Sequence, residues 1–166
     1  MSGRDVSDRQ RRGLILAALS SLSCYPALQP ALSMPMSSPR TASLDAYVGS
    51  YGPSGISRLV LGEQWQAREG LPGAGDPSWL IASADGRRVY AALEGSDQLR
   101  VYQRDADGAL RLRAERASGG RGPVHLALDA GERHLLIAHY VSGELALWSL
   151  DAEGLPQQCL ALRRTG

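Results

Sequence analysis

Five polar side chains have the types and positions that could do chemistry on a small molecule: Glu94, Arg121, His125, His139 and Tyr140. An imidazole can take a proton from water near neutral pH, and a nearby carboxylate can orient or polarise it. We therefore expect His125 to act as a general base with Glu94 beside it. The remaining three are the expected substrate-binding residues, and Arg121 is the one suited to an anionic group because its hydrogen bonds are charge-assisted.

Each of these residues also has a structural interpretation, which the sequence leaves open. His125 could hydrogen-bond the junction between two repeats, and Glu94 could hold a turn. Arg121 could be a solvated loop arginine. His139 could replace an amide that only braces a loop. His134 falls in an outward turn, where we expect it to be exposed.

The elements that must position these residues repeat along the chain with an offset of 46 residues. The matched pairs include Pro77 with Pro123, Leu80 with Leu126, Ala92 with Ala138, Leu99 with Leu145, and Gly108 with Gly154. A period of roughly 40 to 50 residues with about four strands per unit is typical of a β-propeller blade. The apolar residues show no 3.6-residue period, so the predicted fold class is all-β.

The first complete unit contains predicted strands at 79–83, 88–93, 98–104 and 110–116. Asp85-Gly86 and Asp107-Gly108 are expected at hairpin tips, since glycine accepts a positive φ at little cost. The second unit repeats this pattern from Pro123 to about Arg163. Before both, residues 47–51 align with a second strand at an offset of 43, and residues 55–61 and 64–68 follow as third and fourth strands.

These strands make about two and a half four-stranded blades, whereas a propeller typically closes at four to eight. We therefore expect a β-propeller fragment, the front part of a longer protein, with its incomplete first blade closed by the other end of the full-length chain. In each blade the start of the first strand and the end of the second lie at the same rim. His125, Glu94 and Tyr140 should then face one mouth of the central channel.

The isolated chain should leave two broad apolar blade faces uncovered. It should accordingly be poorly stable and inactive as an enzyme by itself.

The first part of the chain has the pattern of a targeting segment. Arg11-Arg12 precedes an apolar run at residues 13–22, and small residues and prolines follow. We expect an export signal of the twin-arginine type at 1–33, a linker at 34–45 and the propeller blades at 46–166. A lipid anchor at Cys24 and a disordered start are the alternatives. The expected location is periplasmic or secreted, with the cytoplasm as the alternative.

Composition excludes several classes of partner. The formal net charge is +1 with both signs interspersed, which argues against nucleic acid binding. Cys24 and Cys159 lack metal-ligand spacing, so neither a zinc site nor a disulfide framework is expected. The apolar run at 13–22 is too short to span a membrane. No cofactor and no metal are expected.

Four motifs at residues 47–51, 76–80, 89–94 and 119–125 carry a resemblance to a known family. In order they read YVGSY, DPSWL, VYAALE and GGRGPVH. Together they resemble the lactonase family of seven-bladed propellers, which contains the propeller type of 6-phosphogluconolactonase, over residues 46–160. The family pattern has Val-Asn-Glu where this chain has Ala92-Leu93-Glu94, and Ala-Asn-Tyr where it has Ala138-His139-Tyr140.

The resemblance implies hydrolysis of a sugar lactone ester by a protein that is a monomer when full length. A water would be deprotonated, charge on the carbonyl oxygen would be stabilised, and Arg121 would meet a substrate phosphate. Two alternatives remain: a propeller that binds peptides or cell-surface partners without catalysis, or a muconate-type lactonising enzyme of the same family. Export would favour the binding class, because 6-phosphogluconate metabolism is cytoplasmic.

Overall fold

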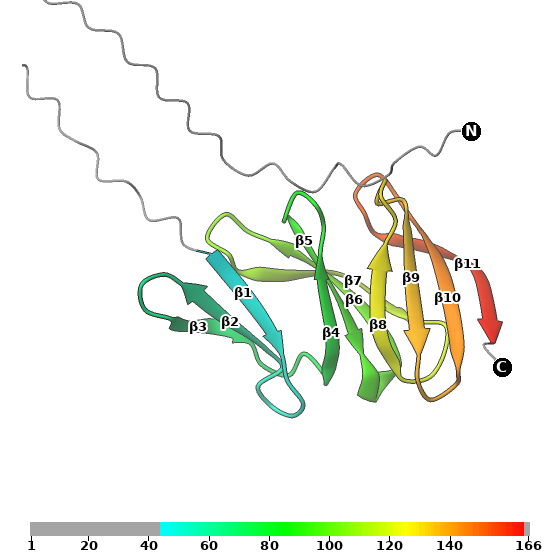
Figure 1. Cartoon of the computed structure of the whole chain (residues 1–166), viewed down its shortest axis with the longest axis horizontal. Coiled ribbons are helices and arrows are strands. Elements are labelled where there is room, and N and C mark those ends of the chain that lie inside the picture. The colour runs from blue at the N-terminus through cyan, green and yellow to red at the C-terminus, as the bar shows by residue number, and fades with distance from the viewer. Residues whose placement is uncertain (1–43, 165–166) are drawn as a thin grey trace, which may run out of the picture. The chain divides into compact units, whose positions relative to one another are not determined.

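The structure, a computed structural model, describes residues 44–164 as eleven strands in three antiparallel sheets (Figure 1). We call these sheets the first, second and third blades. The first blade contains β1 (Leu44–Gly49), β2 (Ile56–Leu61) and β3 (Gln66–Leu71). The second contains β4 (Pro77–Ala82), β5 (Arg88–Leu93), β6 (Gln98–Arg104) and β7 (Leu110–Ala117). The third contains β8 (Pro123–Leu128), β9 (His134–His139), β10 (Glu144–Leu150) and β11 (Pro156–Arg164).

The all-β prediction is confirmed. β5 and β6 have the predicted bounds, and the predicted hairpin-tip residues Gly86 and Gly108 have φ of 66° and 85°. A single 3-10 turn, η1 (Glu94–Ser96), follows β5 in the described range. The predicted export signal lies outside the described residues, as does the predicted linker apart from its last two residues, which belong to β1.

The core consists of the two layers between neighbouring blades, and β5 contributes to both. Val89, Ala91 and Leu93 pack toward the first blade, whereas Tyr90 and Ala92 pack toward the third. Successive side chains of a strand point to opposite faces, so a strand between two neighbours is apolar at every position. All five are at most 3% exposed, and this explains why β5 is a continuous apolar run.

The first and the second blade are each also joined to the following blade by a tyrosine hydrogen bond. The Tyr90 hydroxyl of the second blade donates to the Gly154 carbonyl of the third at 2.8 Å, and the Tyr47 hydroxyl of the first donates to the Gly108 carbonyl of the second at 2.6 Å. The acceptors are 46 residues apart and the donors 43, the two offsets expected from the sequence. β1 is therefore the structural equivalent of β5, and the first blade lacks an equivalent of β4 among the described residues.

An ion pair network reinforces the contact between the first and second blades. The Asp45 carboxylate accepts hydrogen bonds from Arg58 of its own blade and from Arg104 of the second. Burial alone would raise the pKa of Asp45, but the hydrogen bonds from Arg104 and Arg58 outweigh it and lower the pKa.

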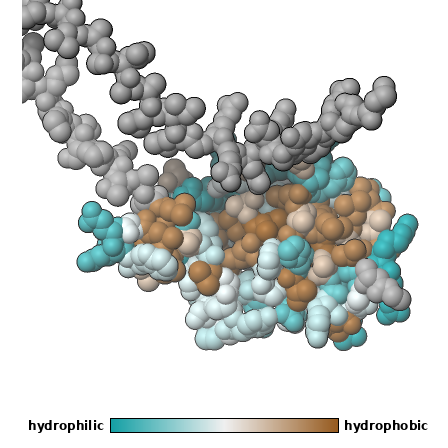
Figure 2. Space-filling model, in the orientation of Figure 1, coloured by the Kyte–Doolittle hydropathy of each residue, from teal (hydrophilic) through white to brown (hydrophobic). Residues whose placement is uncertain are grey.

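The third blade presents apolar side chains on the face turned away from the second. Leu136 lies between the buried Leu135 and Ile137 and points to the opposite face, where it is 39% exposed. Its equivalent in the second blade is Tyr90, which is fully buried. Figure 2 shows hydrophobic residues gathered in the region where β4, β8 and β9 lie. We therefore expect the isolated chain to have a low free energy of unfolding.

Replacing Tyr90 by phenylalanine tests the tyrosine contact. Burial raises the pKa of Tyr90 to about 12, so the hydroxyl stays protonated and donates throughout the neutral range. Its loss leaves the buried Gly154 carbonyl unpaired, and we expect Tyr90→Phe to lower the free energy of unfolding by about 1 kcal/mol. Urea denaturation followed by circular dichroism measures the change.

Tyr140→Phe is the matched control, because Tyr140 is 79% exposed. It should change the stability by less than about 0.5 kcal/mol. Equal effects of the two substitutions would contradict the assigned role of Tyr90.

Candidate functional site

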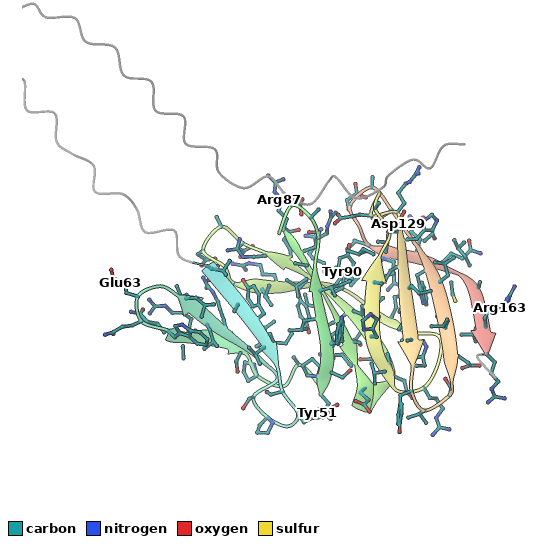
Figure 3. All side chains as sticks on the ribbon, in the orientation of Figure 1. Tyr51, Glu63, Arg87, Tyr90, Asp129 and Arg163 are labelled. Atoms are coloured by element: carbon teal, nitrogen blue, oxygen red, sulfur yellow. The ribbon has the colours of Figure 1, made fainter. Side chains whose placement is uncertain are left out.

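The ends of the second strands and the starts of the innermost strands lie at one end of the blades, which we call the site end. The Glu94 N–H donates to the Asp76 carbonyl just before β4, at 3.2 Å. In the third blade, the Tyr140 N–H donates to the Gly122 carbonyl just before β8, at 2.8 Å. Figure 3 shows Tyr51 at this end. The structure therefore brings the predicted residues of both blades to a common end.

His125 is exposed on β8 and packs against Trp79 of β4. The ring centroids are 4.3 Å apart and the ring planes are inclined by 47°. His125 pairs with Ala138 and Trp79 pairs with Ala92, so the two rings occupy equivalent positions on adjacent innermost strands. Sequence reasoning did not select Trp79, although the 46-residue offset aligns it with His125.

Glu94 is held by a residue of the first blade. Its carboxylate Oε2 accepts a hydrogen bond of 2.5 Å from the Tyr51 hydroxyl. This hydrogen bond to Glu94 is the main reason why the pKa of Tyr51 is raised. Within residues 44–164 no hydrogen bond joins Glu94 to His125. Sequence reasoning also missed Tyr51, which the 43-residue offset aligns with Glu94 itself.

Arg121 lies in the connection between β7 and β8, and its guanidinium is exposed. The backbone amides around it already have partners: the Arg121 N–H donates to Ser142 Oγ at 3.0 Å, and the Gly122 N–H donates to Asp97 Oδ1 at 2.6 Å. These two amides are therefore not free to bind an anion. The guanidinium of Arg121 remains available for an anion at this position.

His139 is buried beneath the same connection and is 3% exposed. Its Nε2 lies 3.0 Å from Ser118 Oγ and its Nδ1 lies 3.3 Å from the Glu144 carbonyl oxygen. Gly120 packs so closely that an added Cβ would come within 2.7 Å of the ring. Burial lowers the pKa of His139 and favours the neutral imidazole. These contacts give His139 a structural role, in which it supports the connection between β7 and β8. The substrate-binding role of His139 stays a prediction.

Tyr140, the next residue, is 79% exposed at the site end. Its hydroxyl makes no hydrogen bond to any of residues 44–164. The side chain is therefore accessible to a ligand, as the substrate-binding prediction requires.

The cavities do not by themselves mark the site. One of about 320 Å³ lies between the first and second blades beside the β6–β7 turn, where Asp107 and Gly108 line it. Another, of about 270 Å³, lies along β1 and includes Trp79. That position is where the sequence predicts a further strand, so we do not assign it to a ligand.

Neither a metal centre nor a membrane span appears in the part of the chain that the structure describes. Residues 44–164 contain no group of three or more His, Cys, Asp or Glu side chains arranged to hold a metal ion. The same residues form no helix of the length and hydropathy that crossing a bilayer requires.

Successive antiparallel sheets, packed face to face and joined by the same tyrosine contact, define the blades of a β-propeller. Residues 45–164 match the family described as Lactonase, 7-bladed beta-propeller. The chain belongs to this family. No curated protein matches it significantly.

Solved structures of similar fold include three bacterial proteins. A candidate 6-phosphogluconolactonase from Bacteroides uniformis is 25% identical with a TM-score of 0.67 over 74% of this chain and 38% of its own. A candidate 6-phosphogluconolactonase from Bacteroides fragilis is 22% identical with a TM-score of 0.66, over 74% and 36%. A periplasmic gluconolactonase from Pseudomonas aeruginosa is 23% identical with a TM-score of 0.59, over 76% and 40%. This chain thus spans well under half the length of these proteins.

The buried His139 makes a prediction for the pH dependence of stability. Its pKa in the folded state lies below the unfolded value of about 6.5, so the unfolded chain binds the proton more readily. Stability should therefore fall as the pH drops from about 6.5 toward the lowered pKa. His139→Asn, which restores the amide of the family pattern, should remove this contribution.

The measurement is the free energy of unfolding at a series of pH values between neutrality and about pH 5. His134→Asn is the control, because His134 is not buried and its imidazole lies 3.5 Å from Asp129 in a turn. An unchanged pH slope in His139→Asn would show that another group is responsible.

Proposed function

We propose that the full-length protein hydrolyses a sugar lactone at the site end of these blades, in the manner of a 6-phosphogluconolactonase. The observation that carries the proposal is an accessible imidazole, His125, at the shared end of two blades in a chain of the lactonase family. The relatives from Bacteroides uniformis and Pseudomonas aeruginosa, a candidate 6-phosphogluconolactonase and a gluconolactonase, support the substrate class.

In this proposal His125 takes a proton from a water molecule. The resulting hydroxide attacks the lactone carbonyl carbon, and the ring C–O bond breaks as the ring oxygen receives a proton from the imidazolium. The product is the open-chain hydroxy acid. Because Glu94 is hydrogen-bonded to Tyr51 and not to His125, its part is to supply a hydrogen-bond acceptor at the same end.

Arg121 binds a phosphate group of the substrate in this scheme. Its guanidinium is exposed and unpaired within residues 44–164, while its own amide and that of Gly122 are anchored to the protein. Because the backbone at Arg121 is held in place, the Cα end of its side chain moves little, and this favours a bidentate contact of the guanidinium with phosphate.

Export of the protein, proposed from residues 1–33, would favour an unphosphorylated lactone instead. The periplasmic gluconolactonase relative is the specific observation in favour of this second substrate. Both substrates contain the same lactone ring, so the chemistry proposed for His125 is common to them.

Substitution of the expected base tests the hydrolysis. His125→Ala in the full-length protein should lower kcat for glucono-1,5-lactone or its 6-phosphate by about 100-fold or more, because a general base contributes at least that factor. Glu94→Ala should also reduce kcat. A pH-stat assay, which follows release of the acid, measures the rate.

His134→Ala is the control: His134 is the half-buried first residue of β9 rather than part of the exposed turn predicted from the sequence, and it lies at the opposite end of that strand from His139. It should leave the rate unchanged. Normal hydrolysis by His125→Ala and Glu94→Ala would reject the assignment of both residues. A wild-type protein with no lactonase activity would favour a binding module.

Arg121→Gln distinguishes the two substrates. Losing a charge-assisted contact should raise KM for the phosphorylated lactone about ten-fold and leave KM for the unphosphorylated lactone unchanged. The control is Arg133→Gln, which removes an exposed arginine from the turn between β8 and β9. Equal KM changes for both lactones in Arg121→Gln would contradict phosphate binding.

A further inference from the structure

Three residues other than glycine have a positive φ within residues 44–164, and all three are acidic. They are Asp76, Asp97 and Glu132, with φ of 40°, 57° and 50°. Each aligns at the 46-residue offset with a glycine that also has a positive φ: Asp76 with Gly122, Asp97 with Gly143, and Glu132 with Gly86. Glycine therefore satisfies the backbone at these positions, and the carboxylates need an explanation in what their side chains contact.

Each of the three carboxylates accepts a hydrogen bond from the backbone of a different segment. Asp76 Oδ1 accepts one from the Gly52 N–H, in the β1–β2 turn of the first blade, at 2.8 Å. Asp97 accepts one from the connection before β8, and Glu132 accepts one from the β4–β5 turn of the second blade. Asp76 and Asp97 lie at the site end, whereas Glu132 lies in the β8–β9 turn at the other end of the blades.

Asp76 differs from the other two because its contacts converge on Glu94. Its carbonyl accepts the Glu94 N–H at 3.2 Å, and its carboxylate holds Gly52, the residue after Tyr51. The Tyr51 hydroxyl in turn donates to Glu94 Oε2 at 2.5 Å. The backbone of Glu94 is thus held by Asp76 directly, and its carboxylate is held by Tyr51 from a turn that Asp76 fixes.

Both links are needed because both side-chain hydrogen bonds are exposed to solvent. Water competes for exposed donors and acceptors, so Tyr51 on a mobile turn would hold the Glu94 carboxylate only weakly. Fixing Gly52 restricts the backbone next to Tyr51 and reduces the conformational entropy that is lost when the hydroxyl bonds. The hydrogen bond to Glu94 also raises the pKa of Tyr51, so the phenol remains a donor at neutral pH.

We propose that Asp76 and Tyr51 are positioning residues that hold the Glu94 carboxylate at the site end for the reaction. This inference rests on the proposed function and deepens it by naming the supports of one of its residues. Neither Asp76 nor Tyr51 needs to touch the substrate. A carboxylate held in one orientation requires no reorganisation during the reaction, so loss of its supports should lower kcat rather than raise KM.

Asp76→Gly is the sharpest test, because Gly122 shows that glycine fits this backbone conformation. In the full-length protein we expect it to lower kcat for glucono-1,5-lactone about ten-fold with KM unchanged, and Tyr51→Phe should do the same. Asp76→Asn keeps an oxygen acceptor and tolerates a positive φ, so its kcat should stay within about two-fold of wild type. Glu132→Gly makes the matching change at the other end and should leave kcat unchanged.

The Glu94→Ala background separates positioning from a general structural role. If Asp76 and Tyr51 act through Glu94, neither Asp76→Gly nor Tyr51→Phe should lower kcat further once Glu94 is replaced. A further loss of about ten-fold in that background would overturn the inference, because the two residues would then act independently of Glu94. Wild-type kcat in both single variants would overturn it as well.

A measurement that needs no turnover keeps this inference distinct from the hydrolysis. In protein isotope-labelled at the tyrosine Cζ carbon, the NMR signal of Tyr51 is the one missing from Tyr51→Phe, and Glu94→Ala shows its position without the hydrogen bond. Asp76→Gly should move the signal toward that position, and Glu132→Gly should not. A moved signal in a protein that hydrolyses no lactone would support the positioning of Glu94 and reject the hydrolysis. An unmoved signal in Asp76→Gly would reject the positioning, whether or not the protein hydrolyses a lactone.

Discussion

Every sheet in this structure depends on a neighbouring sheet to cover it. β5 illustrates the constraint, because Tyr90 and Leu93 are fully buried although they point to opposite faces of the same strand. A single blade could bury neither set of side chains alone, so the blades stabilise one another in sequence. The Tyr47 and Tyr90 hydroxyls also donate hydrogen bonds to glycine carbonyls of the following blade, and these polar contacts supplement the apolar packing.

This constraint also decides where chemistry can occur. The faces of the inner strands are occupied by packing, so the polar side chains that are accessible at the site end lie at strand ends or on the innermost strands. Arg121 and Tyr140 follow the first rule, since one precedes β8 and the other follows β9. His125 follows the second. The site end is thus a consequence of how the sheets pack. Its residues come from equivalent positions in neighbouring blades.

The sequence predicted the repeat, the strands and the common end of the blades, because these depend on local periodicity and on the 46-residue offset. Asp85-Gly86 and Asp107-Gly108 mark turns by their own conformational preferences, and such signals need no distant partner. The contacts of Glu94 with Tyr51 and of His125 with Trp79 were not predicted. Each joins residues of different blades, and side-chain direction at the irregularities before Trp79 and His125 cannot be derived from a period-2 pattern.

Equivalent positions of the second and third blades hold side chains with different structural and functional roles. His139 occupies the position of Leu93, and both are buried, so the change from leucine places a polar ring where it must find partners. It finds them in Ser118 Oγ and the Glu144 carbonyl. Trp148 donates to the carbonyl of the same serine. The connection that carries Arg121 is therefore supported by buried side chains that a ligand need not contact.

His125, in contrast, occupies the position of Trp79 and is accessible. His139 and His125 thus have different roles: the buried His139 supports the connection that ends at β8, and the exposed His125 is free to act from β8 itself.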